Sequence, residues 1–237
     1  CADSIIRVYA EYYWSLGEYD KIAFHLTNGF LMKYTKWREG NRLKVDGNNV
    51  SWSKTANFDD SYENFLKYIN MVFAYAGTLS LSAESNKINL EDLRPGDMFL
   101  EGGSPGHCLL VVDIAKNIDG ERSFLLAQGY MPAQDFHVLK NPLHPEDPWY
   151  YVSEVDFPLS SPSWIFDEGS LVRWGDFPIN VANEELIFNH ANEEAALPAM
   201  SYNNETDAIG SDNQVTLLAV GDNLIHIEVV ESGEQID

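Results

Sequence analysis

The segment Leu93-Arg94-Pro95-Gly96-Asp97-Met98-Phe99-Leu100 joins a turn signal to an apolar run. Pro and Gly favour tight turns, and the apolar residues after them are typical of a strand. The glycine-rich stretch Gly102–Gly106 then leads to His107 and a second apolar run, Cys108–Ile114. A third run, Ser123–Gln128, follows the polar residues Asn117–Gly120, which favours an antiparallel hairpin. These runs predict an antiparallel sheet in the middle of the chain.

Two helices are predicted before these strands in the sequence. Apolar residues recur at helical spacing over Ala2–Leu16 and again over Ser61–Ala76, where Asp59 or Asp60 is the expected N-cap. Between the two helices, Asp46–Asn49 is a turn signal between short strands. Together these elements predict an α+β fold in which a helix packs on an antiparallel sheet.

The composition restricts the classes of function. The 237 residues include 37 acidic and 15 basic side chains, which gives a net charge of −22. Binding of nucleic acid or of an anionic membrane surface needs clustered Lys and Arg, so the composition argues against both. No run of about 18 apolar residues occurs, and no transmembrane segment is predicted. The two cysteines are too few for a disulfide framework or a cysteine-rich zinc site.

The balance of charge changes along the chain. Every Lys and Arg lies between Arg7 and Arg173, whereas residues 174–237 hold 13 acidic groups and no basic group. We therefore predict a domain over residues 1–174, an acidic linker over 175–214, and the start of a second domain over 215–237. Because residue 1 already lies inside a periodic pattern and the chain stops soon after an apolar strand, both domains are interpreted as truncated.

Cys1 and His107 are the residues best suited to covalent chemistry. A thiol becomes a nucleophile when its thiolate is stabilised, and the N–H groups and macrodipole of a helix N-terminus provide this stabilisation next to Cys1. A nearby imidazole completes the ion pair and later protonates the leaving group. A lone Cys, or a lone His at a strand start, is more often structural, so this hypothesis needs both residues in one place.

Strand parity adds Gln128 to this pair. If Ile118 and Asp119 form a two-residue hairpin loop, Gln128 is the diagonal neighbour of His107 on the same face of the sheet. Its amide oxygen could then accept a hydrogen bond from the imidazole and fix the tautomer. The same parity places Cys108 on the opposite face, which argues against a disulfide between the two cysteines. A register slip of one residue would reverse this arrangement.

These residues resemble the NlpC-type papain-like cysteine peptidases and amidases. In that family a Cys starts a helix, a Pro-Gly-Asp turn enters a strand, a Gly-His pair opens the next strand, and a polar third residue follows. The resemblance implies a papain-like fold in which Cys1 is the nucleophile, His107 the base and Gln128 the third residue. Because Cys1 and His107 are farther apart in sequence than is usual in that family, it also implies an insertion at Ile22–Asn57.

A closer resemblance covers about residues 1–174. In this region the chain resembles an uncharacterised bacterial family known only as a domain of unknown function. That resemblance implies no established activity and no cofactor for this domain. The motifs that carry it are Cys1–Ser4, Thr27–Phe30, Gly102–His107 and Leu126–Gln134.

The end of the chain resembles a different family. Val215–His226 is similar to the opening of CapA-type poly-γ-glutamate capsule proteins, which have a metallophosphatase-like fold. In that fold an Asp at the end of the first strand binds metal, which implies that Asp222 is a metal ligand and that the complete domain takes a divalent metal. A strand followed by a tight Gly221–Asp222 turn accounts for the same residues without a metal.

Taken together, the resemblances imply a cysteine-dependent amide or isopeptide hydrolase that acts on a cell-envelope or capsule peptide. The expected substrate is a peptide, peptidoglycan or poly-γ-glutamate type molecule, and the expected location is extracytoplasmic. The alternative is a non-catalytic papain-like binding or structural module of the cell surface. Two further explanations of Cys1 rank lower: a lipoprotein would continue with a polar tether, and an N-terminal-nucleophile amidohydrolase would begin with a strand.

Overall fold

The segment Leu93–Leu100 forms the turn and strand that its sequence predicts. The computed structural model describes residues 1–132, 134–175, 186–188, 217–220 and 224–227. Gly96 in the turn has a φ of +89°, a left-handed backbone conformation that glycine adopts without strain. Strand β6 (Met98–Glu101) follows and pairs with β7 (His107–Asn117), which in turn pairs with β8 (Arg122–Gln128). The predicted antiparallel strands are confirmed.

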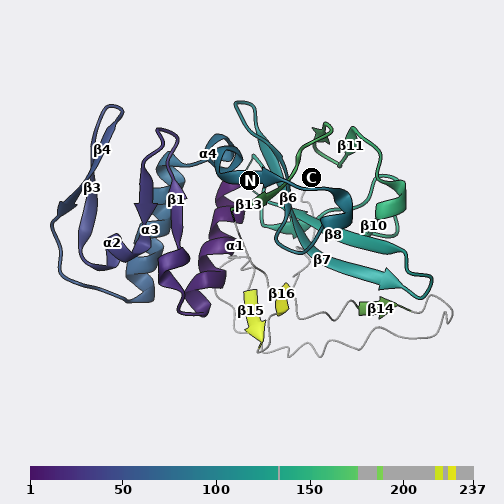
Figure 1. Cartoon of the computed structure of the whole chain (residues 1–237), viewed down its shortest axis with the longest axis horizontal. Coiled ribbons are helices and arrows are strands. Elements are labelled where there is room, and N and C mark those ends of the chain that lie inside the picture. Colours follow the sequence, from purple (N-terminus) through teal and green to yellow (C-terminus); the bar gives the residue numbers. More distant parts are fainter. Residues whose placement is uncertain (133, 176–185, 189–216, 221–223, 228–237) are drawn as a thin grey trace, which may run out of the picture.

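These three strands form the centre of one large sheet (Figure 1). Its strand order is β10-β8-β7-β6-β13-β5, and β9 and β14 pair with β8 and β7 outside this path. All pairs are antiparallel except that of β14 with β7. The other strands of the sheet are β5 (Ser85–Lys87), β9 (His137–Val138), β10 (Tyr150–Tyr151), β13 (Leu171–Trp174) and β14 (Leu186–Phe188).

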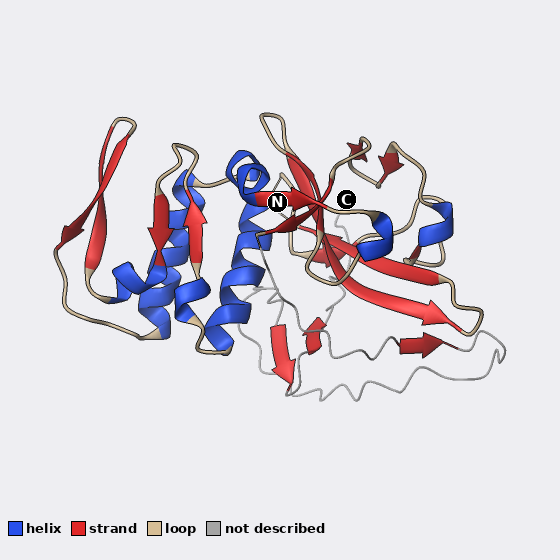
Figure 2. Ribbon diagram, in the orientation of Figure 1, coloured by secondary structure: helices blue, strands red, loops and turns tan. Residues whose placement is uncertain are grey.

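The α-helices lie toward one side of this sheet, on the left in Figure 2. In the described residues the α-helices are α1 (Ala2–Ser15), α2 (Tyr34–Arg38), α3 (Tyr62–Tyr75) and α4 (Thr78–Glu84). The short 3₁₀-helices are η1 (Tyr19–Lys21), η2 (Leu90–Asp92) and η3 (Val152–Glu154). The two-stranded sheets pair β1 (Ala23–His25) with β2 (Leu31–Lys33), β3 (Asn41–Asp46) with β4 (Asn49–Lys54), β11 (Leu159–Ser160) with β12 (Ile165–Phe166), and β15 (Leu217–Val220) with β16 (Leu224–Ile227).

Both predicted helices are confirmed, with one correction at a cap. Helix α3 is capped by Ser61, whose side-chain oxygen accepts a hydrogen bond from the Asn64 backbone N–H at 3.2 Å. The carboxylate of Asp59 instead accepts from the Ser61 backbone N–H. Asp59 therefore fixes the approach to the helix, and the residue directly before the first helical turn forms the cap.

The large sheet separates two apolar cores. Alternate residues of β7 enter opposite cores, as a strand with both faces covered requires: Cys108 and Leu110 face the helical side, and Leu109 and Val111 face the other side. Helices α1 and α3 and hairpin β1–β2 fill the first core, and residues from β10 to β12 fill the second. The predicted placement of Cys108 on the face opposite to that of His107 is confirmed, and neither cysteine forms a disulfide bond.

A buried ion pair joins the Pro-Gly-Asp turn to β13, the strand that pairs with β6. Asp97 is 1% exposed, and its two carboxylate oxygens accept hydrogen bonds from Arg173 of β13 at 2.7 and 2.9 Å. One of these oxygens also accepts from the Arg94 backbone N–H across the turn. Burial raises the pKa of Asp97, and the hydrogen bonds from Arg173 and Arg94 lower it in part. Asp97 therefore organises the turn.

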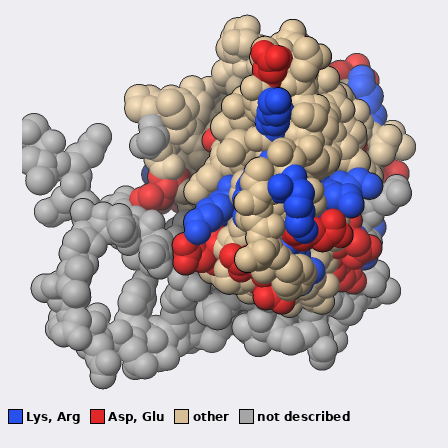
Figure 3. Space-filling model, turned by 90° about the vertical axis from the view of Figure 1, so that its left-hand side faces the viewer, with Lys and Arg blue, Asp and Glu red and all other residues tan. Residues whose placement is uncertain are grey.

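Residues 22–57 stand apart from the large sheet. They form the hairpins β1–β2 and β3–β4 and helix α2, none of which joins the large sheet. Basic side chains gather on the end of the molecule that carries β3 and β4, with acidic side chains among them (Figure 3). The fold is α+β with a helix packed on an antiparallel sheet, while the papain-like assignment and the insertion stay predictions.

Most of the predicted linker and second domain lies outside the described residues. Within them, β15 falls inside the predicted apolar strand Val215–Val220, and β16 follows it. Asp222, the predicted metal ligand, is not among the described residues. In the part of the chain that is described, no helix combines the length and apolar character needed to cross a bilayer.

The buried ion pair makes a stability prediction. Replacement of Arg173 by Met should lower the free energy of unfolding by about 3–5 kcal/mol, because it leaves the Asp97 carboxylate buried without its counter-charge. The loss should shrink in acid, where Asp97 takes up a proton more readily without Arg173. Urea unfolding followed by circular dichroism measures both effects.

The control is Lys67→Met, which breaks the exposed pair of Lys67 with Glu63. Exposed pairs of this kind contribute about 0.3–0.5 kcal/mol. A loss for Arg173→Met no larger than that of the control would show that the buried pair does not hold the turn.

Candidate active site

His107 lies at the start of β7, at the end of a tightly packed loop. In the pairing with β6 it stands opposite Glu101, and its side chain is 2% exposed. The residue before it is Gly106, where an added Cβ would lie 2.3 Å from the Thr78 Oγ1 atom. Thr78 is the first residue of α4, and its hydroxyl donates to the Gly103 carbonyl. Glycine therefore lets the loop approach α4 closely, which fixes where His107 enters the strand.

Gln128, the last residue of β8, contacts the imidazole of His107. The Gln128 Oε1 atom is 2.7 Å from His107 Nε2 and also accepts a hydrogen bond from the Ser163 hydroxyl at 3.0 Å. Because an amide oxygen only accepts, the proton of a neutral His107 resides on Nε2. The Nδ1 atom then has a free lone pair and can act as a base. The predicted same-face contact of His107 and Gln128 is confirmed as geometry.

The hairpin loop between β7 and β8 differs from the predicted one. Asn117 donates its backbone N–H to Glu121, so the loop contains Ile118, Asp119 and Gly120 rather than two residues. Gly120 has a φ of +86°, which suits a three-residue loop. A β-bulge between Val111 and Asp113 absorbs the extra residue.

The bulge restores the predicted register at the His107 end of the hairpin. Leu110 pairs with Ala127 and Val111 with Leu126, as a two-residue loop would also require. The prediction of a two-residue loop is thus wrong. The bulge in the same hairpin compensates for the extra loop residue, so Gln128 still lies where the predicted register places it.

Cys1 lies at the N-terminus of α1 and next to the start of β7. Its backbone carbonyl accepts from Ser4 and Ile5, which is the first hydrogen bonding of the helix. Its sulfur is 4.0 Å from the carbonyl oxygen of Gly106, the residue that precedes His107. In the described residues the Cys1 thiol makes no hydrogen bond to the His107 ring. The structure therefore brings Cys1 beside the strand start that carries His107, while the direct contact of a catalytic pair is not formed.

Aromatic side chains cover the imidazole of His107. The rings of Tyr130 and Trp164 have centroids 5.2 Å from that of His107, and Phe166 lies at 6.2 Å. Burial lowers the pKa of His107, and the hydrogen bond that the ring donates to Gln128 raises it in part. The site therefore favours a neutral imidazole.

The two cysteines lie in different environments. Burial raises the pKa of Cys108 to about 12, so this thiol stays protonated and inert at neutral pH. Cys1 is partly exposed. Any thiol chemistry of the described domain therefore belongs to Cys1.

Comparison with known families places this site in a defined domain. Residues 1–173 match the family described as Domain of unknown function (4846), DUF4846. The chain belongs to the DUF4846 family. No curated protein and no solved structure gives a match. The resemblance of residues 1–174 to a family known only as a domain of unknown function is thus consistent with the comparison. The NlpC-type and CapA-type resemblances stay predictions.

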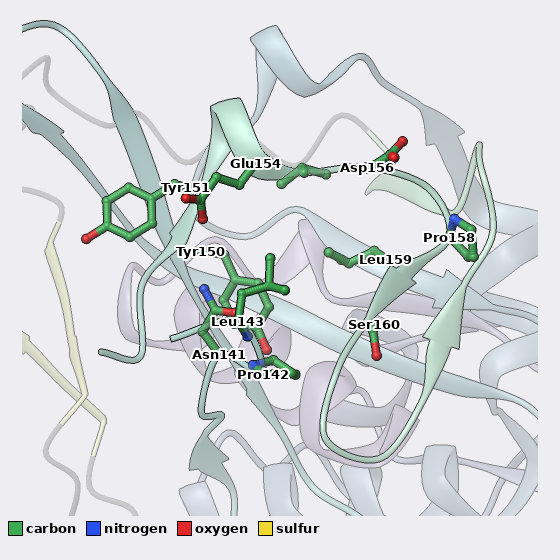
Figure 4. A pocket seen from close by; sticks show the side chains of 11 residues that line it. Asn141, Pro142, Leu143, Tyr150, Tyr151, Glu154, Asp156, Pro158, Leu159 and Ser160 are labelled. Carbon is green, nitrogen blue, oxygen red and sulfur yellow. The ribbon is translucent and has the colours of Figure 1, made fainter. Parts of the chain in front are cut away.

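A cavity of about 190 Å³ lies on the side of the large sheet that carries the second core of the DUF4846 domain (Figure 4). Residues from Asn141 to Ser160 line it, and none of Cys1, His107 and Gln128 is among them. Two acidic residues, Glu154 and Asp156, belong to the lining, and Glu154 is paired with His144, which lies outside it. Among the described residues, no group of three or more His, Cys, Asp and Glu side chains is placed to hold a metal ion.

Sequence reasoning missed the residues of the DUF4846 domain that reach His107 from β12 and the loop before it. Ser163, which orients Gln128, and the ring of Trp164 come from a segment that shows no strand or helix periodicity. Their contacts depend on how this loop folds over the sheet. Tyr130 is different, because a hairpin with the two-residue loop Ile118–Asp119 would pair it with His107.

The burial of His107 predicts a pH dependence of stability. Because its pKa in the folded DUF4846 domain is lowered, the folded state binds fewer protons than the unfolded state as the pH falls below about 6.5. His107 thus contributes stability that is present above that pH and is lost as the pH falls through the folded-state pKa.

Urea unfolding of the wild type and of His107→Gln between pH 8 and pH 5 tests this. The stability advantage of the wild type over the variant should decrease toward pH 5. An advantage that is constant or grows in acid would mean that His107 is not held in its neutral form.

Proposed function

We propose that residues 1–174 form a cysteine-dependent amide or isopeptide hydrolase of the peptidase or amidase type. The observation that carries the proposal is the 2.7 Å hydrogen bond between His107 and Gln128, with the sulfur of Cys1 beside Gly106 at the same end of the sheet. A thiol at a helix N-terminus, a base and an orienting group are the parts that nucleophilic catalysis by cysteine needs.

In the proposed reaction His107 moves a proton between sulfur and nitrogen. Nδ1 of His107 takes the thiol proton of Cys1, and the thiolate attacks the amide carbonyl to form a carbon–sulfur bond. The carbon–nitrogen bond then breaks, and His107 donates the proton to the leaving amine. A water molecule, deprotonated by His107, attacks the thioester, which releases the carboxylic acid and restores the thiol.

Two features of α1 support Cys1 as the nucleophile. The N–H groups of the first helical turn have no partners within the helix, and the macrodipole places positive potential there. Gly129 allows α1 to lie close to β8, because a Cβ at this position would be 2.3 Å from the Ser4 Oγ atom. The first turn of α1 thus lies against the residue that follows Gln128.

The substrate class rests on the sequence resemblances. The NlpC-type motifs and the CapA-type residues after position 214 favour a cell-envelope or capsule peptide, of the peptidoglycan or poly-γ-glutamate type, and an extracytoplasmic location. In the same proposal Asp222 ligates a divalent metal in the complete CapA-like domain. The net charge of −22 means that an anionic polymer has to bind in a locally neutral cleft.

One observation favours the alternative, a non-catalytic papain-like module. The 2% exposure of His107 beneath Tyr130 and Trp164 leaves little room for a substrate at the ring. In an active enzyme the aromatic cover has to move when the substrate binds.

The pH dependence of alkylation by iodoacetamide separates the two functions. If His107 accepts the thiol proton, the alkylation pKa of Cys1 should lie well below about 8.5 and should rise in His107→Ala. Peptide mapping by mass spectrometry resolves Cys1 from Cys108, whose pKa of about 12 makes it an unreactive internal reference.

The matched control is His144→Ala, which removes a histidine that pairs with Glu154 away from the site. An alkylation pKa that is the same in wild type and His107→Ala would reject the catalytic assignment and leave the non-catalytic module.

A second experiment tests the orienting group. Gln128→Leu should slow Cys1 alkylation at pH 7 by about tenfold, which is the effect of losing one hydrogen bond to a charged group. Ser163→Ala keeps the contact of Gln128 with His107 and should have a smaller effect. Equal rates in wild type and Gln128→Leu would mean that the His107–Gln128 contact only supports the fold.

A further inference from the structure

A second cavity lies between hairpin β1–β2, helix α4 and the end of β13. Its volume is about 590 Å³. Its lining residues are Ala23, His25, Leu26, Thr27, Gly29, Leu31, Leu79, Ser80, Ala83, Glu84, Trp174 and Gly175. None of Cys1, His107, Gln128 and Ser163 belongs to it, so it is distinct from the candidate active site.

The cavity combines apolar walls with one acidic group. Leu26, Leu31, Leu79 and Ala83 contribute aliphatic side chains, and Leu79 is 54% exposed. Glu84 is the single carboxylate of the lining, which includes no Lys or Arg. A ligand that is complementary to this lining has an apolar body and a positively charged, hydrogen-donating group.

Glu84 is held in a fixed orientation. Its Oε1 atom accepts hydrogen bonds from the backbone N–H of His25 and from the His25 ring at Nδ1, and its Oε2 atom accepts from the indole N–H of Trp174. The side chain is 11% exposed. A carboxylate offers about four acceptor positions, and the three described hydrogen bonds leave one position for a ligand.

The neighbours of Glu84 are themselves fixed. The ring of Trp174 is stacked between Tyr9 at 4.8 Å and Phe24 at 5.0 Å, which prevents the indole from turning away. With its Nδ1 proton directed to Glu84, a neutral His25 keeps an acceptor lone pair on Nε2. The cavity thus presents two acceptors from rigid elements, and a primary ammonium group, which has three donors, matches them.

We propose that this cavity binds a small primary amine with an apolar body. The ammonium group pairs with Glu84, and the apolar body covers Leu79 and Leu31. The proposal gives a role to the Thr27–Phe30 motif, which the hydrolase mechanism does not use. Thr27 is fixed by hydrogen bonds from its N–H and hydroxyl to the Tyr75 carbonyl, and Gly29 has a φ of +82° in the turn beside the cavity.

Phenethylamine is the test probe, and 2-phenylethanol and 3-phenylpropanoate are its neutral and anionic counterparts of similar size. Isothermal titration calorimetry on the full chain should show that the amine binds at least about tenfold more tightly than the alcohol, because only the amine gains a charge-assisted hydrogen bond. The carboxylate should bind more weakly than either. In ¹H–¹⁵N spectra the indole N–H resonance of Trp174, assigned with Trp174→Phe, should shift with the amine alone.

Two variants locate the site. Glu84→Gln should remove the preference for the amine over the alcohol, whereas Glu63→Gln at an exposed position of α3 should leave it unchanged. Ala83→Leu adds apolar volume inside the cavity at an exposed helix position and should weaken the binding of all three probes. It keeps the test decisive even if Glu84→Gln disturbs the fold.

Three results would overturn the proposal. The first is equal affinity for the amine and the alcohol, the second is amine binding that survives both Glu84→Gln and Ala83→Leu, and the third is no binding of phenethylamine at millimolar concentration. None of these results bears on Cys1 or His107, so the proposal stands or falls separately from the hydrolase function.

Discussion

The carboxylate of Asp97 is a buried charge that meets two N–H groups of Arg173 and one backbone N–H group of Arg94. A buried carboxylate without such partners would cost several kcal/mol, so the segments that carry these donors are held where they can reach it. Arg173 also donates to the Asp92 carbonyl, which extends the network to the segment before the turn. The entry to β6 and the strand β13 are therefore fixed together at the centre of the sheet.

The same turn sets the position of the candidate site. The Tyr9 hydroxyl of α1 donates to the Gly96 carbonyl at 2.7 Å, and the Gly96 backbone N–H donates to Val111 in β7. Helix α1, which begins next to Cys1, and strand β7, which begins at His107, are thus hydrogen-bonded to the same residue of the turn. A change at Asp97 is therefore expected to act on the elements that carry both candidate residues, although neither residue touches the ion pair.

The sequence was informative where structure depends on local pattern. The contact of His107 with Gln128 follows from strand alternation, and it survives the error in the loop at Asn117 because a bulge returns the register to its predicted value. Arg173 and Ser163 could not be predicted in this way. Arg173 lies 76 residues from Asp97 and Ser163 lies 35 residues from Gln128, and no periodic pattern links residues so far apart.

The identity of the orienting group determines how the proposed site is activated. A carboxylate beside His107 would stabilise the imidazolium by its charge and raise the pKa of the ring. Gln128 has no charge, so it fixes the tautomer without offsetting the cost of burying a positive ring. Burial favours a neutral His107, so in the proposed mechanism the charge of the imidazolium has to be offset by the Cys1 thiolate rather than by the third residue. Gln128 then keeps the Nδ1 lone pair of His107 available for the thiol proton, and the N-terminus of α1 adds to the stabilisation of the thiolate.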